Sequence, residues 1–285
     1  MLTKKHKWVL ELETKKFVEN LMTGNYKTHF KNNWIEFADF REYTPWDDAK
    51  KIDFISSAKS GKILVKLWEE QRELDVYFLP FFWEDIDFKF WEFSKREIFE
   101  ELLFVLWIST VKNQNKLWSL FYNKWNKNIF PLGKSLAHFY DFFHKIENNN
   151  FWNSIWRNKK TISEKLSYFN GLKIKNSLVF LFTSDLDIDE KILKIAALKN
   201  DLVICNVFHS FENSLDSNYM VWLSDSNDEL FIDLNNEEKK GEYRKLRKQK
   251  VIDFRKKVRK SWASYLYFDE KVNIFAELYT FFKNR

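Results

Sequence analysis

The sequence predicts an α/β protein built on an open, mostly parallel sheet with helices on both faces. Strand-like and helix-like segments alternate between residues 74 and 210, which is typical of such sheets. Residues 177–182 and 202–208 are continuous apolar runs of strand length, as expected for strands buried on both faces of a parallel sheet. Between them, Asp189 can cap a helix over residues 190–199.

Two capping boxes mark further helices. Ser94 with Glu97, and Thr161 with Glu164, place a hydroxyl and a carboxylate where they can satisfy the free amides of a helix start. The first box precedes an apolar run over residues 98–111. We also expect strands at residues 63–68, 76–82 and 117–122, and helices at residues 10–21, 134–146 and 272–283. Residues 26–62 break into short polar and aromatic pieces.

Composition limits the class of protein. The 285 residues are 45% hydrophobic and 19% aromatic, which excludes intrinsic disorder and allows a sizeable core. The single Cys205 excludes an intrachain disulfide and suits a reducing compartment. The longest apolar runs fall short of the roughly 20 residues that cross a bilayer, and the N-terminus does not resemble a signal peptide. We therefore expect no membrane span and a cytoplasmic location.

The sequence lacks the short motifs of common enzyme classes. It contains no P-loop, no dinucleotide-binding fingerprint and no nucleophile elbow, and its five histidines have no metal-ligand spacing. We therefore expect no cofactor and no enzymatic activity.

Most of the positive charge lies in one segment. The chain has a net charge of +6, whereas residues 239–260 carry 12 basic side chains against Glu242 and Asp253. Asn235 or Asn236 supplies the start signal of a long helix with a basic face and an apolar stripe. The predicted stripe consists of Tyr243, Leu246, Val251, Phe254, Val258 and Trp262. The basic face could contact phosphates, anionic lipid or an acidic partner, although such faces are more often only solvated.

The most specific feature is the stretch EFADFREYTPWDDAKKIDF over residues 36–54. It is followed by SAK at residues 57–59, VK at residues 65–66 and EEQREL at residues 69–74. This succession resembles the signature of the family called domain of unknown function 58. TSDL at residues 183–186 and FFKNR at the end of the chain are similar to later motifs of that family.

The resemblance implies a von Willebrand A-like α/β domain over residues 74–285 that ends in helices. An N-terminal helix and the signature segment, residues 1–73, would precede this domain. Family members are encoded beside AAA ATPases of the MoxR type and are thought to work with them in assembling or maturing other complexes. The resemblance therefore implies a MoxR-type AAA ATPase and a client protein as partners, although a fold alone does not fix a function.

The resemblance also implies that a metal site has been lost. Relatives with an intact metal adhesion site place Asp-x-Ser-x-Ser after the first core strand, where oxygen ligands hold a divalent cation. Those three positions are Phe81, Trp83 and Asp85 in this chain, so only the last keeps an oxygen ligand, together with Asp185. We expect a degenerate site without metal, in which Phe81 and Trp83 fill the hollow and form an exposed aromatic surface for a partner protein.

Three aspartates of the signature segment allow two interpretations. They could form an acidic cluster that binds a divalent metal, or they could cap turns and pair with Arg41, Lys50 or Lys51. We favour caps and pairs, because no His or second acidic motif accompanies the aspartates at ligand spacing. The candidate residues of this segment, for docking or for its own fold, are Arg41, Tyr43, Asp47, Asp48 and Asp53.

The sequence therefore predicts a non-enzymatic, cytoplasmic interaction protein that serves a MoxR-type AAA ATPase and has no functional metal site. One alternative is a nucleic-acid-binding protein that uses the basic helix over residues 239–260. A second alternative is a divalent-metal hydrolase built on Asp47, Asp48 and Asp53.

Overall fold

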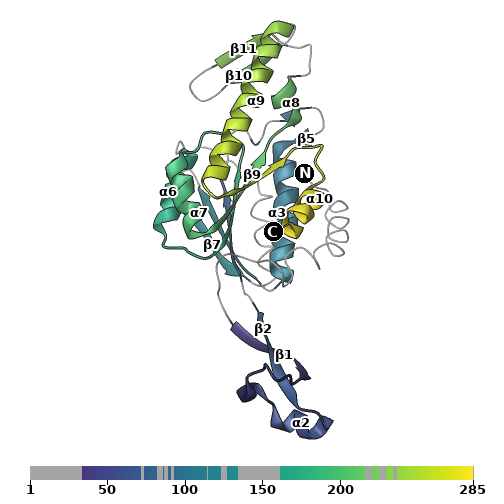
Figure 1. Ribbon diagram of the computed structural model, residues 1–285. Helices are drawn as coiled ribbons and strands as arrows, with labels where there is room; N and C mark the ends of the chain where they lie inside the picture. The colour runs from purple at the N-terminus through teal and green to yellow at the C-terminus, as the bar shows by residue number, and fades with distance from the viewer. Residues whose placement is uncertain are drawn as a thin grey trace. The chain divides into compact units, whose positions relative to one another are not determined.

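The computed structural model describes residues 34–71, 74–81, 86, 89–90, 93–113, 115–122, 127–133, 161–215, 220–224, 229–233 and 236–284 (Figure 1). These residues belong to two compact units, a small one within residues 31–74 and a large one that contains residues 75–285. The helices expected at residues 10–21 and 134–146 lie outside the described residues, as do the candidate residues Trp83 and Asp85.

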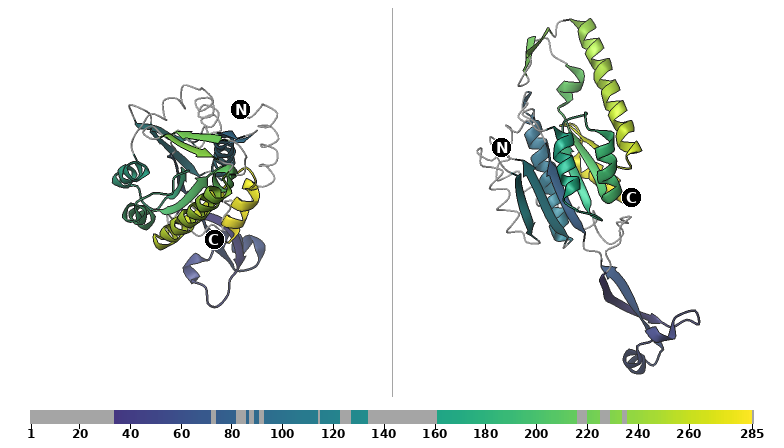
Figure 2. Two further views of the ribbon diagram at one scale, coloured as in Figure 1. Left: turned by 90° about the horizontal axis from the view of Figure 1, so that it is seen from above. Right: turned by 90° about the vertical axis from the view of Figure 1, so that its left-hand side faces the viewer.

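The large unit contains a six-stranded sheet in the order β12-β9-β8-β3-β6-β7 (Figure 2). Its strands are β3 (Asp75–Pro80), β6 (Lys116–Tyr122), β7 (Lys127–Gly133), β8 (Leu178–Thr183), β9 (Asp201–Val207) and β12 (Ser264–Phe268). Five strands are parallel, and β7 pairs antiparallel with β6 at one edge. The strand order reverses between β3 and β8, which is the doubly wound arrangement. The predicted open, mostly parallel sheet is confirmed.

Helices cover both faces of this sheet, as predicted. The helices are α3 (Lys95–Lys112) and α10 (Ile274–Lys283) on one face and α6 (Ile162–Gly171), α7 (Glu190–Lys199) and α9 (Glu237–Lys260) on the other. Alternate residues of β8 show the division. The Phe180 ring lies 6.4 Å from the Phe282 ring of α10, between centroids. Val179 instead joins a buried cluster with Leu166 of α6 and Phe254 of α9.

The predicted helix starts are correct. The Ser94 hydroxyl accepts from the Glu97 amide at 3.2 Å, and a Glu97 carboxylate oxygen accepts from the Ser94 amide at 3.1 Å. Thr161 and Glu164 form the second capping box at the start of α6. Asp189 caps α7, and Asn236 rather than its neighbour caps α9.

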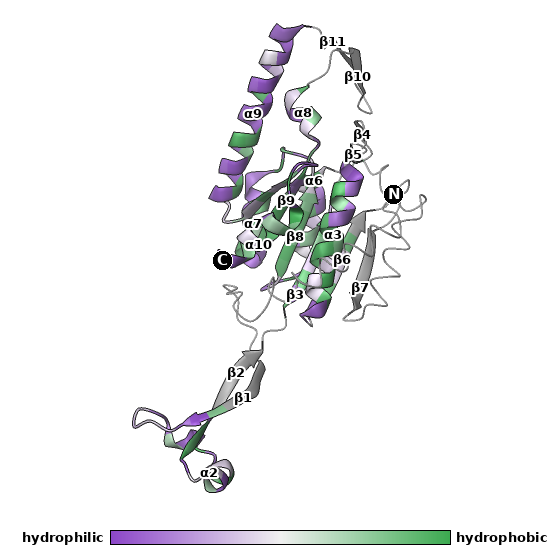
Figure 3. Ribbon diagram, turned by 90° about the vertical axis from the view of Figure 1, so that its right-hand side faces the viewer, coloured by the Kyte–Doolittle hydropathy of each residue, from purple (hydrophilic) through white to green (hydrophobic). Residues whose placement is uncertain are grey.

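The predicted apolar stripe of α9 is partly wrong. Phe254 and Val258 are buried, but Leu246 and Trp262 are largely exposed. Leu246 lies away from the buried side of the helix by its angular position. Trp262 lies beyond the end of α9, where its φ angle of 65° turns the chain out of the helix. The helix is therefore more hydrophilic than the stripe suggested, as Figure 3 shows by its colour.

The neighbouring strands β8 and β9 are almost entirely buried. Every residue of β8 is buried, and β9 is buried from its second residue onward. Cys205 of β9 is fully buried, and burial raises the pKa of its thiol far above the ordinary range. Among the described residues, no helix combines the length and the apolar character needed to cross a bilayer.

Several short elements are not predicted by the sequence. Besides β7 and β12, they are β4 (Lys89–Phe90), β5 (Phe93–Ser94), α8 (Ser210–Ser214), β10 (Met220–Ser224) and β11 (Glu229–Asp233). The strands β10 and β11 form an antiparallel hairpin between α8 and α9.

The small unit is a two-stranded antiparallel ribbon that carries two short helical segments. Its elements are β1 (Trp34–Glu42), the 3-10 turn η1 (Ala49–Lys51), α2 (Phe54–Ser60) and β2 (Leu64–Gln71). The sequence predicts β2 but neither β1 nor α2. Gly61 ends α2 with a φ angle of 70°, a left-handed conformation that glycine adopts without steric cost.

Candidate functional site

Phe81 lies at the carboxyl end of β3, where open α/β sheets usually bind ligands. Its amide donates to the carbonyl of Phe182 at 2.9 Å, so the residue extends the pairing of β3 with β8. The Phe81 side chain is 0% exposed and belongs to the same buried cluster as Leu79 and Leu166. The expectation that Phe81 contributes to an exposed aromatic surface is therefore wrong, because the pleat of β3 turns its ring toward α6.

Asp185 follows β8 at the same edge of the sheet, and its polar atoms organise a turn. Its amide donates to the Thr183 hydroxyl at 3.1 Å, and one carboxylate oxygen accepts from the Asp187 amide at 2.8 Å. The Asn206 side-chain amide donates to the Asp185 carbonyl at 3.2 Å. Through these hydrogen bonds Asp185 stabilises the turn that follows β8.

A buried lysine supplies positive charge near Asp185. Lys165 of α6 is only 2% exposed. Burial lowers the pKa of its ammonium to about 8, and the Asp185 carboxylate acts in the opposite direction. An ammonium in this position would repel a divalent cation.

The described residues at this edge do not fit a divalent metal. Phe81 supplies no oxygen, and the Thr183 hydroxyl already accepts a hydrogen bond from Asp185. Within the described part of the chain, no group of three or more His, Cys, Asp or Glu side chains is placed to hold a metal ion.

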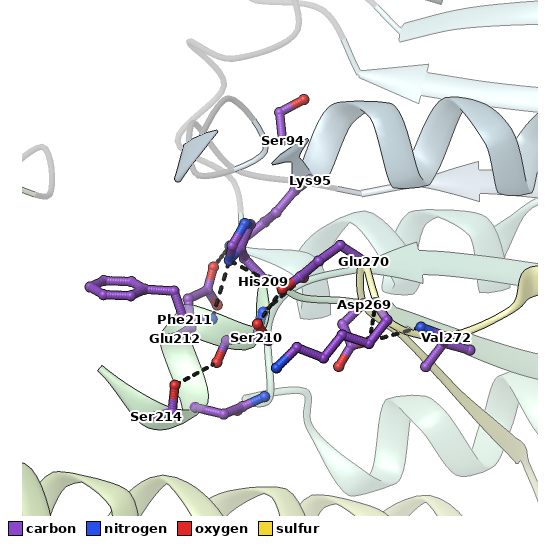
Figure 4. Close-up of polar contacts among 12 residues, drawn as sticks. Ser94, Lys95, His209, Ser210, Phe211, Glu212, Ser214, Asp269, Glu270 and Val272 are labelled. Carbon is purple, nitrogen blue, oxygen red and sulfur yellow. Dashed lines mark hydrogen bonds and ion pairs between the residues drawn. The ribbon is translucent and has the colours of Figure 1, made fainter. Parts of the chain in front are cut away.

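A second group of charged residues joins α3, α8 and α9, and Figure 4 shows its members Lys95 and Glu212. Lys95, whose side chain is almost fully buried, forms an ion pair with Glu212 of α8. Glu212 also pairs with Arg247 of α9 at 3.2 Å, and the Arg247 guanidinium lies 4.7 Å from the centroid of the Phe208 ring. This network fixes the amino-terminal half of α9 to α8 and, through Glu212, to the start of α3.

His209, Ser210 and Glu270 lie beside this network, and their arrangement is not that of a catalytic triad. The Ser210 hydroxyl donates directly to Glu270, and the Ser210 amide donates to the other carboxylate oxygen at 3.0 Å. Burial acts to raise the pKa of Glu270, but these two hydrogen bonds hold it below its ordinary value. The His209 Nδ1 atom accepts from the Phe211 amide at 3.2 Å. The imidazole therefore does not link the serine to the carboxylate, as nucleophilic catalysis would require.

The aspartates of the small unit act as caps and ion-pair partners, as the favoured interpretation predicted. Asp47 accepts from Arg41 at 2.8 Å, and Arg41 is the main cause that lowers the Asp47 pKa to about 2. Asp48 caps η1. Asp53 caps α2 and pairs with Lys66, which lowers the Asp53 pKa to about 2.

The predicted partners in this unit are only partly right. In the described part of the chain, neither Lys50 nor Lys51 pairs with these aspartates, because both residues lie in the short turn that Asp48 caps. Lys66 of β2 takes that place opposite Asp53. The amide of Tyr43, another candidate residue, donates to the Ile63 carbonyl at 2.8 Å and extends the pairing of β1 with β2.

The small unit also exposes large apolar side chains that the sequence reasoning missed. They are Trp46, Phe54, Ile55 and Ile63. Trp46 is 96% exposed. Val65 is buried in the same unit.

The sheet order and the helices on both faces define a doubly wound α/β protein, consistent with a von Willebrand A-like fold. The sequence model of the family described as "Protein of unknown function DUF58" matches residues 39–252. The chain therefore belongs to this family. A comparison with curated proteins gave no match.

Proposed function

We propose that this chain is a non-enzymatic interaction protein and that its small unit contacts a partner protein. The observation that supports this proposal is the exposure of Trp46, Phe54, Ile55 and Ile63 within one unit of 44 residues. Large apolar side chains that remain exposed in a small folded unit are typical of protein interaction sites. Tryptophan in particular is enriched among the residues that dominate binding energy.

The partner we propose is a MoxR-type AAA ATPase. The chain and this ATPase would act together on a client protein. The resemblance in the signature segment supports this choice, and the exposed residues lie within that same segment. Arg41 with Asp47, and Asp53 with Lys66, would hold the turns that carry Trp46 and Phe54 in place. The charged residues of the segment would then affect docking indirectly, by stabilising its fold.

The residues at the carboxyl edge of the sheet support a role that involves neither catalysis nor a bound metal ion. Phe81 fills the core there, and a buried ammonium lies near Asp185. Near this edge Glu212 is engaged in ion pairs and Glu270 in hydrogen bonds. Stoichiometric uptake of Mg²⁺ or Mn²⁺ in a calorimetric titration would contradict this part of the proposal.

The test is direct binding between this chain and the MoxR-type ATPase of the same genome, measured with both proteins purified. Trp46→Ser and Phe54→Ser should each weaken binding, the first by at least about 30-fold if Trp46 contributes the roughly 2 kcal/mol of a binding hot spot. The folded fraction should stay unchanged, because both side chains are already in water.

Two exposed residues of α7 provide a matched control. Ile195→Ser and Leu198→Ser remove apolar side chains that are also exposed, but in the large unit. We expect these variants to bind the ATPase as the natural chain does. Equal losses in both pairs of variants, or no loss for Trp46→Ser, would refute a contact through the small unit.

A further inference from the structure

One flank of α9 carries a row of exposed side chains, four of which are cations. The row consists of Lys245, Lys248, Ile252, Arg255 and Arg259. Its members follow one another at spacings of three or four residues, so they line one side of the helix. In the described part of the chain, no carboxylate lies within ion-pair distance of the four cations. The row extends over about 21 Å from its first to its last residue.

A hollow of about 490 Å³ lies at the end of this row, between α9, β12 and α10. Its lining includes Arg255, Arg259, Tyr265, Tyr267, Glu277 and Phe281. The Arg255 guanidinium lies 5.1 Å from the centroid of the Tyr265 ring. The volume falls within the range of sites that bind small molecules or single groups of a larger ligand. The hollow therefore combines two arginines with three aromatic rings and one carboxylate.

Trp262 adds an unusual feature beside the hollow. The helix end is a Schellman motif, in which the Ala263 amide donates to the Val258 carbonyl and the Trp262 amide to the Arg259 carbonyl. The residue at this left-handed position is usually glycine, because a side chain there is strained. Here it is tryptophan with a φ angle of 65°, and its side chain is 79% exposed. Neither burial nor backbone preference accounts for this residue.

We propose that this row, the hollow and Trp262 form a binding site for single-stranded nucleic acid. The phosphates would lie along the cations of α9, and bases would stack on Trp262 and on the rings of the hollow. A basic row next to aromatic platforms is the combination by which proteins bind single strands. An acidic protein segment would match the charge, but only nucleic acid supplies both a regular row of charges and planar bases. This site uses other residues than the proposed contact of the small unit.

The first test is the binding of a labelled single strand of about 15 nucleotides, as RNA and as DNA, to the full chain. If four phosphates are neutralised, the slope of log affinity against log salt should be about −3. Affinity should then fall about 50-fold between roughly 50 and 200 mM salt. The absence of saturable binding at the lower salt concentration would overturn the proposal.

Matched double variants locate the site. Lys245→Ala with Lys248→Ala removes two cations of the row, and should halve the salt slope and weaken binding. Lys239→Ala with Lys250→Ala changes the net charge equally but lies on the opposite flank of α9, and should leave binding nearly unchanged. All four side chains are exposed, so none of these changes should affect folding. If the two double variants weaken binding equally, binding depends only on the net charge of the chain and not on this row, and the proposal is overturned.

Trp262→Gly separates binding from stability. Glycine relieves the strain of the left-handed position, so the melting temperature should stay equal or rise. Loss of one stacking platform should weaken binding of the single strand at least about fivefold. Unchanged binding would exclude Trp262 from the site. A competition experiment tests the acidic-protein alternative. If polyglutamate displaces the labelled strand as effectively as unlabelled nucleic acid of equal charge, the row binds an acidic protein and the proposal is overturned.

Discussion

Lys165 allows a quantitative test of how the carboxyl edge of the sheet is built. Its pKa is about 8 in the folded chain against a reference value of 10.5, because burial disfavours the charged form. The folded state therefore releases the proton at a lower pH than the unfolded state. Stability is reduced while Lys165 is charged below about pH 8, and it should rise between about pH 8 and 10.5. The difference between the two pKa values corresponds to about 3 kcal/mol.

Lys165→Met keeps the length of the side chain but removes its charge. We expect the variant to be more stable than the natural chain at pH 7 by about 1–3 kcal/mol, because well-packed apolar groups often replace buried ions without loss. The gain is smaller than the full 3 kcal/mol if Asp185 loses a favourable neighbour. At pH 10 the difference between the two proteins should shrink toward zero, since Lys165 is then neutral in the folded state.

Urea denaturation followed by tryptophan fluorescence at pH 7 and pH 10 measures both differences. Lys194→Met, on the exposed side of α7, makes the same substitution without burial and should change stability little at either pH. A loss of 2 kcal/mol or more in Lys165→Met at pH 7 would refute the reasoning. It would mean that attraction to Asp185 outweighs the cost of burying the ammonium.

Three further predictions concern the other residues described above. Phe81→Ala should lower the free energy of unfolding by about 3–5 kcal/mol in chemical denaturation, and a loss below 1 kcal/mol would show that the ring is not a core residue. Glu212→Gln should cost about 3 kcal/mol by the same assay, because the buried Lys95 and the largely buried Arg247 both lose the negative charge of Glu212, and an unchanged value would mean that water replaces it. NMR titration should place the carboxylates of Asp47 and Asp53 near a pKa of 2 rather than 3.8. The ion pairs would then support the small unit above about pH 4 and be lost as the pH falls toward 2, whereas midpoints near 4 would show that the pairs do not form in solution.

The elements that the sequence predicts are those whose signals are local. The apolar runs of β8 and β9 and the caps of α3, α6, α7 and α9 lie within a few residues of the elements they mark. The strands β1 and β12 are stabilised by pairing with β2 and β9, which lie far away along the chain. The five residues of β12 include strand-favouring aromatics, but so short a run does not by itself identify a strand directly after a long helix.

In the candidate site, too, contacts between residues close in the sequence are predictable, whereas those that depend on distant residues are not. The ion pair of Arg41 with Asp47 joins residues six positions apart and is predictable from the signature segment. The direction of the Phe81 ring depends on the register of β3 against β8, which the sequence does not contain. The burial of Lys165 contradicts its ordinary preference for water, so only the packing of α6 against the sheet reveals it.

The burial of Cys205 has a practical consequence for experiments on the small unit. Thiol-reactive dyes and spin labels are attacked by the thiolate form of cysteine, and the only thiol of the chain is fully buried with a raised pKa. A cysteine introduced at an exposed position, such as Trp46→Cys, can therefore be labelled selectively without first removing the natural one. Pairs of such labels would report the distance between the two units in solution.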